Sequence, residues 1–273
     1  MIFIVGGSSL IGYALAAKFS QSSVKYYSSS RSIRSSYVYF DLSSHLDYDL
    51  IFPSDVTTVV LCAGLTSFSS CSSDPSLSYN VNVTSIKRLI SYLIGRGIYI
   101  IFLSSNAVFE ASLAFSHEDA PRHPVSIYAY QKCLVENYLI SSTYSYYSII
   151  RLGKVISRST PLISQWSSSL ASCKQIKAFS NIYTSPISLD FALEVICRVI
   201  FLKPSAAVFN STASHDISFY FLALHLCNYL NLNFKNVVQS ISDQSYIPTC
   251  NSLSCSNLSL LDLYSPDPSN CFS

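Results

Sequence analysis

Three side chains in the middle of the chain have the types and spacing that proton transfer requires. Tyr128 and Lys132 lie four residues apart in SIYAYQKCLVE and therefore share one face of a predicted helix. A free tyrosine has a pKa of about 10, and nearby positive charge, such as an ammonium, would lower it, so that the phenol exchanges a proton with a substrate oxygen. The same chemistry needs a hydroxyl that holds a carbonyl group, and Ser105 in FLSSNAVF supplies one. Because the chain holds 20 tyrosines, the spacing alone decides nothing, and the surrounding elements carry the argument.

Short β-rich runs alternate with helical patterns over the first 155 residues, and these elements would position the three side chains. The run VTTVVLCAG is continuous and apolar, which is typical of a parallel strand that is buried on both faces. Strands that alternate with helices predict an α/β fold with a Rossmann-like, doubly wound parallel sheet. The carboxyl ends of such strands bind ligands, and Ser105 lies at one of them. The predicted strands are residues 2–7, 24–27, 37–42, 56–64, 98–105 and 147–153, with helices in 9–20, in 75–97 and from 126 onward.

The alternation weakens after residue 155, which predicts a division of the chain into two parts. We expect a dinucleotide-binding Rossmann domain at 1–157 and a smaller substrate-binding lobe at 158–273. Part of the lobe, about 183–202, is expected to pack back on the Rossmann domain. Helical patterns occur in 161–179, 185–201 and 216–232, and 246–263 is expected to be mostly irregular.

The segment GGSSLIG follows the first strand and opens a helix, which is the setting for a dinucleotide pyrophosphate. Glycines allow a tight turn and a close approach to phosphate, while the helix N-terminus offers free N–H groups and a partial positive charge. In a G-x-x-G-x-x-G frame Gly6 and Gly12 occupy the outer positions, and Ser9 replaces the middle glycine. The Ser9 hydroxyl could donate to a phosphate oxygen. The alternative is an ordinary turn between a strand and a helix.

The end of the second strand indicates which nicotinamide cofactor the chain would bind. A strand-end acid about 20 residues after the glycines would bind the ribose hydroxyls of NAD, and none is present. Ser30 and Arg31 stand there instead. A guanidinium suits a 2′-phosphate, which favours NADP over NAD; the alternative is an exposed loop arginine. Asp41, at the end of YVYFDL, could accept from the adenine amino group, or it could cap a helix.

Composition and charge restrict the class of protein. The formal net charge of +2 is too small to indicate nucleic acid or a membrane surface as a partner. No uninterrupted apolar run reaches the length of a membrane span, and MIFIVGG predicts a first strand rather than a signal peptide. Nine cysteines without a C-x-x-C pair and five histidines without ligand spacing predict reduced thiols, no metal site and a cytoplasmic protein.

A series of segments over residues 1–155 resembles the extended short-chain dehydrogenases/reductases. In chain order these are GGSSLIG, FDL, LCAGLTS, DPSLSYNVNVTS, FLSSNAVF, PVSIYAYQK and IIRLGKV. The sequence is most similar to the dTDP-4-dehydrorhamnose reductase branch of sugar-nucleotide enzymes. In that branch a VF pair follows the catalytic Ser/Thr, and later segments resemble TSPISLDFALEVI and IPTCNSLSC.

The resemblance implies roles for individual residues. Tyr128 would be the proton donor, Lys132 its partner and a ligand of the nicotinamide ribose, and Ser105 the hydroxyl that polarises the carbonyl. Trp166 would stack on the base or sugar, in a cleft between the sheet and the lobe, and Asn106 would lie on the substrate side. The other residues implied to bind or support the cofactor are Gly6, Ser9, Leu10, Ile11, Gly12, Ser30, Arg31, Asp41, Leu42, Ala63, Gly64, Asn82 and Ser104.

The resemblance also narrows the reaction. Dehydratases of the family follow the catalytic Thr with Asp-Glu, whereas Asn106 and Ala107 follow Ser105 here, so dehydration is disfavoured. A reductase of a 4-keto-6-deoxy sugar nucleotide, acting in deoxysugar or surface polysaccharide biosynthesis, is the leading hypothesis, and an NAD-dependent epimerase is an alternative. Ser9, Ala111 and Ala129 occupy positions where the family tends to have glycine. A catalytically silent nucleotide-sugar-binding or regulatory subunit is therefore a third hypothesis, and the oligomeric state stays open, with a homodimer possible.

Overall fold

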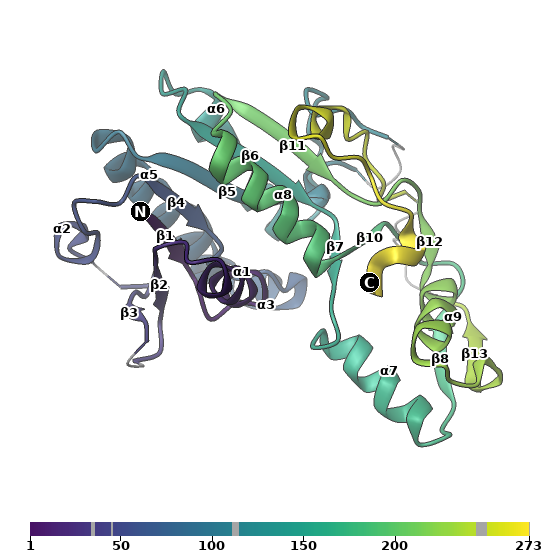
Figure 1. The fold of residues 1–273 in the computed structure, drawn as a ribbon. Coiled ribbons are helices and arrows are strands. Elements are labelled where there is room, and N and C mark those ends of the chain that lie inside the picture. The colour runs from purple at the N-terminus through teal and green to yellow at the C-terminus, as the bar shows by residue number, and fades with distance from the viewer. Residues whose placement is uncertain (34–35, 45, 111–114, 244–249, 273) are drawn as a thin grey trace.

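A seven-stranded parallel sheet forms the centre of the protein (Figure 1). The computed structural model describes residues 1–33, 36–44, 46–110, 115–243 and 250–272. The strand order is β11-β6-β5-β4-β1-β2-β3. Strands β2 and β3 lie on one side of β1, and β4, β5, β6 and β11 lie on the other, so the direction of winding changes at β1. This arrangement confirms the predicted Rossmann-like sheet. The strands are β1 (Ile2–Val5), β2 (Tyr26–Ser30), β3 (Val38–Tyr39), β4 (Thr58–Leu61), β5 (Tyr99–Ser105), β6 (Tyr147–Leu152) and β11 (Ala207–Ser211).

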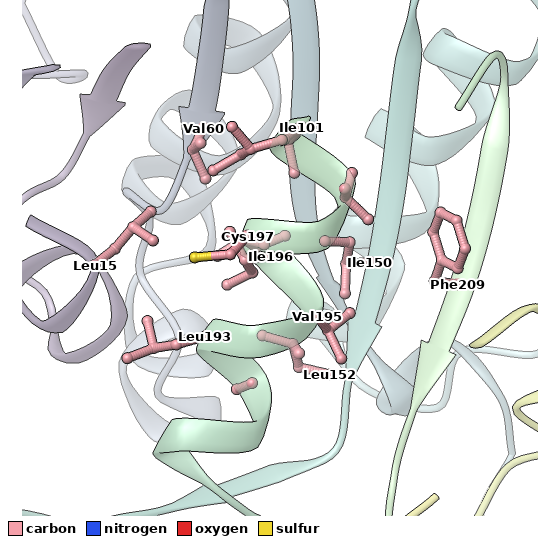
Figure 2. Packing of buried hydrophobic residues seen from close by; sticks show 14 of the residues in the cluster. Leu15, Val60, Ile101, Ile150, Leu152, Leu193, Val195, Ile196, Cys197 and Phe209 are labelled. Atoms are coloured by element: carbon pink, nitrogen blue, oxygen red, sulfur yellow. The ribbon is translucent and has the colours of Figure 1, made fainter. Parts of the chain in front are cut away.

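Helices cover both faces of this sheet, because successive side chains of each buried strand point to opposite faces. Ile2 and Ile4 of β1 pack with α1 (Leu10–Gln21) and α8 (Leu189–Leu202), whereas Phe3 and Val5 pack with α5 (Ile86–Gly95) and α6 (Ile127–Ile140). Figure 2 shows how α8 lies on the face of the sheet to which Ile2 and Ile4 contribute. Its side chains meet those of β4, β5, β6 and β11, the labelled residues being Leu193, Val195, Ile196, Cys197, Val60, Ile101, Ile150, Leu152 and Phe209.

The helix predicted for residues 75–97 begins at Pro75 and ends at Gly95, as expected. It has three sections, α4 (Pro75–Tyr79), a π-helical section at Asn80–Ser85 and α5. Insertions of π-helical geometry are frequent at functional sites. Asn82 lies in this section and points toward the loop after β4, where it bonds the backbone of Leu65.

The second and third strands differ from the prediction. Strand β2 includes Ser28, Ser29 and Ser30, which the sequence places in a polar loop, and all three are buried. Ser29 is hydrogen-bonded in the interior, because its Oγ accepts from Gly6 N at 3.2 Å and donates to Ile4 O at 3.4 Å, whereas the buried Ser28 Oγ has no hydrogen-bond partner among the described residues. Strand β3 is reduced to two residues.

Residues that follow β6 in the chain also form a smaller lobe, and its core contains the helices α7 (Pro161–Ala171) and α9 (Phe219–Leu230). Its strands form three pairs. The pairs are β7 (Lys154–Ile156) with β10 (Pro186–Ser188), β9 (Tyr183–Thr184) with β12 (Ile217–Ser218), and β8 (Ile176–Phe179) with β13 (Val237–Ser240). The remaining short helices are α2 (Tyr48–Ile51), α3 (Phe68–Ser73) and 3₁₀ segments at Asn106–Val108, Phe234–Asn236, Ser256–Leu261 and Pro268–Phe272.

The segment that returns to the sheet is longer than the predicted 183–202. Strand β11 adds to the edge of the sheet beside β6, and the 3₁₀ segment Ser256–Leu261 buries Leu258 and Leu261 in the cluster under α8. Among the described helices, none combines the length and apolar character that crossing a bilayer requires.

Candidate active site

The three predicted catalytic side chains line one cavity of about 740 Å³ at the carboxyl ends of the central strands. Ser105 is the last residue of β5, Tyr128 stands in the first turn of α6, and Lys132 follows one turn later. Ser126 caps α6, since its Oγ accepts from Ala129 N at 3.1 Å. The Lys132 ammonium lies 5.8 Å from the centroid of the Tyr128 ring. The structure therefore brings together the groups that the sequence pairs.

Burial raises the pKa of Tyr128 to about 12, a shift that a hydrogen bond with Ser105 opposes and the Cys71 thiol enhances. The sequence predicts a lowered pKa for Tyr128, through nearby positive charge. In the chain alone, desolvation of the phenol is the largest effect on this pKa and raises it, so the shift is opposite to the predicted one. The neutral phenol, which burial favours, is the form that donates a proton.

Lys132 has a fixed position and a perturbed pKa. Its Nζ donates to Leu103 O at 2.8 Å and lies 4.6 Å from the centroid of the Phe102 ring. Burial lowers the pKa of Lys132 to about 8, against the opposing charge of Glu136. Lys132 is therefore protonated at neutral pH and close to its titration point just above it.

Ser105 and Asn106 connect the sheet to the C-terminal part of the chain. Ser105 Oγ donates to Asn106 Oδ1 at 3.3 Å and accepts from Ala107 N at 3.2 Å. Asn106 Nδ2 in turn donates to Asn251 O at 3.1 Å. Both Asn106 and Asn251 line the cavity, and the role of Asn106 on the substrate side stays a prediction.

The turn between β1 and α1 can accommodate a pyrophosphate. Gly6 has φ +87°, and a Cβ there would lie 2.7 Å from the backbone of Ala63. A Cβ on Gly12 would lie 2.3 Å from Gly6 O. The N–H groups of Leu10 and Ile11, in the first turn of α1, have no hydrogen-bond partner among the described residues. Free N–H groups at a helix N-terminus are the groups that bind phosphate.

Ser9 fits its position in this turn without the conformational freedom of glycine. Its φ is −73°, which any L-residue adopts, and its Oγ accepts from Gly12 N at 3.1 Å as the cap of α1. The hydroxyl that we expected to donate to a phosphate thus accepts a hydrogen bond from Gly12 N, one of the N–H groups at the start of the helix.

The residues predicted near the adenosine half of the cofactor are dispersed. Ser30 is buried and donates to Ser8 Oγ at 3.3 Å, which ties β2 to the glycine turn, whereas Arg31 is exposed at the strand end. Asp41 Oδ1 accepts from Ser43 N at 2.9 Å and caps a turn, and Leu42 is buried in the core. For Asp41 and Leu42 these contacts correspond to structural roles.

The loop after β4 carries Ala63 and Gly64, and Asn82 holds it in place. The Asn82 amide accepts from Leu65 N at 2.8 Å and donates to Leu65 O at 2.9 Å. It also donates to Gln131 Oε1 at 2.8 Å, a residue of α6 between Tyr128 and Lys132. Ala63 lines the cavity, whereas Asn82 is not among its lining residues and holds the loop by these contacts; its predicted role at the cofactor stays a prediction.

A buried polar network that the sequence does not predict lies behind Ser105. Ser104 Oγ donates to Glu136 Oε1 at 2.5 Å, and the guanidinium groups of Arg151 and Arg122 both reach Glu136 Oε2 at 2.8 Å. Burial alone would raise the pKa of Glu136, but the hydrogen bonds and charge of Arg151, with Ser104 and Arg122, hold it below its ordinary value. The signal in the sequence is Arg151 itself, a charge within the apolar strand YSIIRLG.

Trp166 does not line the cavity. Its indole is 6% exposed and belongs to the hydrophobic core of the lobe, with Ile163 and Leu170 of the same helix. We therefore do not assign it to stacking on a substrate. Ala111 and the first three residues of IPTCNSLSC, 247–249, lie outside the described residues.

The lobe contributes cavity residues that the sequence does not single out. Lys154 follows the strand end in IIRLGKV, a position where the sequence could have indicated it. The other members of this wall are Ile182, Tyr183, Thr184, Phe219, Cys250, Asn251 and Leu253. In the part of the chain that the structure describes, no group of three or more His, Cys, Asp or Glu side chains could hold a metal ion.

The chain is similar to a known protein family and to several solved structures. The family model described as "RmlD substrate binding domain" matches residues 1–263. No curated protein matches the chain at a significant level. Similar solved structures include a hypothetical dTDP-4-dehydrorhamnose reductase from Sulfolobus tokodaii, with 20% identity, 99% of both chains covered and a TM-score of 0.82.

Two further similar structures are also named as dTDP-4-dehydrorhamnose reductases. The dTDP-4-dehydrorhamnose reductase from Bacillus anthracis, in complex with NADP, is 15% identical over 99% of this chain and 95% of that chain, with a TM-score of 0.85. The one from Clostridium acetobutylicum is 18% identical over 99% and 96%, also with a TM-score of 0.85. At these identities the likeness establishes the fold.

Proposed function

Because the chain belongs to the RmlD substrate binding domain family, we propose that it is an NAD(P)-dependent reductase of a 4-keto-6-deoxy sugar nucleotide. Such a reaction belongs to deoxysugar or surface polysaccharide biosynthesis. One observation carries the proposal: Ser105, Tyr128 and Lys132 line a single cavity that also reaches Ile11 of the glycine turn. The shape of the turn, with free N–H groups on Leu10 and Ile11, supports a dinucleotide as the cofactor.

Each residue has a defined task in this proposal. The nicotinamide cofactor, when bound, supplies the hydride. Ser105 donates a hydrogen bond to the carbonyl oxygen of the sugar, and Tyr128 gives that oxygen its proton as the hydroxyl forms. The ammonium of Lys132 favours the phenolate that remains. The exposed Arg31 would pair with a 2′-phosphate, which supports NADP over NAD as the preferred cofactor.

The proposal is tested by NADPH and NADH oxidation with a panel of 4-keto-6-deoxy nucleotide sugars. We expect Tyr128→Phe to lose about 10²- to 10⁴-fold of the activity and to keep its affinity for the cofactor. Tyr130→Phe is the matched control, because Tyr130 stands two residues later on the same helix and is 53% exposed. Wild-type protein that oxidises neither cofactor, or equal rates for wild type and Tyr128→Phe, would contradict the proposal.

An epimerase would use the same three side chains, and this assay separates the two activities. An epimerase returns the hydride to its substrate, so it interconverts sugar nucleotides without net oxidation of the cofactor. Conversion of UDP-glucose or a related sugar nucleotide at constant NADH absorbance would favour the epimerase.

A catalytically silent nucleotide-sugar-binding or regulatory subunit is the second candidate. The observation that favours it is the Ser9 hydroxyl, which occupies Gly12 N and leaves one fewer N–H group for the phosphates. This candidate predicts that a dinucleotide raises the melting temperature, that no sugar nucleotide is turned over, and that an enzyme partner co-purifies with the chain.

A further inference from the structure

Lys154 lines the cavity on the side of the lobe, and the pairing of β5 with β6 places its backbone near Ser105. Leu152 pairs with Ser105 across β5 and β6, and Lys154 begins β7 two residues later. Two residues of extended chain advance at most about 7 Å, so the backbone at Lys154 lies near that of Ser105. Lys154 lines the same cavity as Ser105, together with Tyr183 and Phe219 of the lobe.

Among the described residues, no carboxylate forms an ion pair with Lys154. Its Nζ lies 5.7 Å from the centroid of the Phe219 ring. The ion pairs among the described residues involve the basic groups Arg122, Arg151 and Arg198. Glu110, the acidic side chain of the cavity wall, is in none of these pairs. The residues outside the described ranges contain no Asp or Glu.

Lys154 is an exposed residue at the start of β7 that lines the cavity, so an anionic ligand can reach its ammonium. Partial desolvation by the cavity wall lowers the pKa of Lys154, and no carboxylate contributes an opposing effect. Lys132, the other lysine of the cavity wall, already donates to Leu103 O. Lys154 is therefore the lysine of the described cavity wall whose ammonium is free to receive a ligand.

We propose that Lys154 binds an oxyanion of the substrate, a phosphate of the nucleoside diphosphate, and so fixes the distance between the diphosphate and Ser105. The inference rests on the proposed function, because it takes the sugar carbonyl to lie at Ser105. A hydrogen bond from an ammonium to a phosphate oxygen is charge-assisted and therefore stronger than one between neutral groups. The carboxylate of a uronic sugar is the other source of the same chemistry.

Calorimetric titration of the full chain with UDP and dTDP, and with uridine and thymidine, tests the inference. We expect Lys154→Gln to weaken the binding of both diphosphates at least tenfold and to leave nucleoside binding unchanged. Lys154→Arg should retain most of the affinity. Lys177→Gln is the matched control, because Lys177 is an exposed lysine on β8 of the same lobe, and circular dichroism melts verify that each variant is folded.

Paired titrations with UDP-glucose and UDP-glucuronic acid identify the source of the oxyanion. If Lys154→Gln weakens only UDP-glucuronic acid, the oxyanion is the sugar carboxylate. Equal affinities of wild type and Lys154→Gln for every anion, or a wild type that binds none of them, would overturn the inference. NADPH binding, followed by its fluorescence, is a separate measurement, so its loss would count against the proposed function and its presence would confine the failure to Lys154.

Discussion

Burial shifts the pKa values of Tyr128 and Lys132 toward the neutral form of each group. The pKa of Tyr128 rises to about 12 and that of Lys132 falls to about 8. Below pH 8 the pair therefore consists of a neutral phenol and an ammonium. This is the protonation state that a proton donor needs before it acts, and it exists before any ligand binds.

The Lys132 shift predicts a pH dependence of stability. Between its folded pKa of about 8 and its ordinary value of 10.5, the unfolded chain holds a proton that the folded chain has released. The contribution of Lys132 to the free energy of unfolding therefore rises with pH across that window. Lys132→Met lacks this contribution, so it should be more stable than wild type at pH 7, and the difference should narrow toward pH 10. Urea unfolding of both proteins at several pH values measures it, and a constant difference would contradict the prediction.

The sequence predicts which residues line the cavity where local position decides it. That Ser105, Tyr128 and Lys132 come together could be predicted, because the position on a strand end or a helix face determines where each side chain points. For Asp41 the sequence leaves an adenine contact and a cap open, and the structure shows a cap, through a local bond from Ser43 N. The position of Trp166 could not be predicted, because packing in the lobe core, a tertiary contact, decides it.

At the scale of elements, the turn before α1 shows how serine can replace glycine. Ser9 keeps a negative φ and caps the helix, while Gly12 has no room for a Cβ beside Gly6 O. The two positions of the glycine frame are thus physically different, although they look equivalent in the sequence.

Substitutions at Ser9 and Gly12 should differ in their effect on cofactor binding. Ser9→Ala should lower the free energy of unfolding by about 1 kcal/mol, and Ser9→Gly by only a few tenths, with NADPH affinity retained because Gly12 N becomes free. Gly12→Ala should reduce NADPH affinity, since its Cβ would displace the backbone of Gly6. Denaturant unfolding and NADPH fluorescence titration provide the two readouts. Wild-type NADPH affinity in Gly12→Ala would show that the turn does not hold the cofactor.

The network around Glu136 joins α6, β5, β6 and the loop that carries Arg122. Glu136→Gln should destabilise the fold by about 3–5 kcal/mol, because Arg151 is left as an unpaired charge in the interior. Glu194→Gln is the matched control, since it removes a partly exposed pair of the same type on α8 and should cost about 0.5 kcal/mol or less. Chemical denaturation compares the two, and equal losses would mean that the buried pair has no special weight.

Strand β11 is the element that the sequence conceals. Its residues, AVFNS, contain a short apolar run that ends in Asn210 and Ser211, and these polar side chains interrupt the pattern of a buried strand. Asn210 Nδ2 donates to the carbonyl groups of Ser116 and Ser254. Both partners are more than 40 residues away in the chain, so local patterns could not indicate that the asparagine is satisfied in the interior.

At the scale of the whole molecule, the predicted boundary at residue 157 separates parts that share one core. Helix α8 and strand β11 both come after it, yet α8 buries Leu193, Val195 and Ile196 against the sheet and β11 covers the edge of β6. The division into a cofactor-binding Rossmann domain and a substrate-binding lobe stays a prediction, whereas the hydrophobic core includes residues from both parts.

This shared core predicts that residues 1–157 do not fold alone. Without α8 the fragment would expose the apolar face of β1, β4, β5 and β6, and a patch of that kind causes association. We expect aggregation on size-exclusion chromatography and no cooperative melt by circular dichroism. Co-expression with residues 158–273 should restore a soluble complex, because the missing helix and strand are then supplied in trans. A monomeric, cooperatively melting fragment would instead establish 1–157 as an independent domain, and α8 would then stabilise the lobe rather than the sheet.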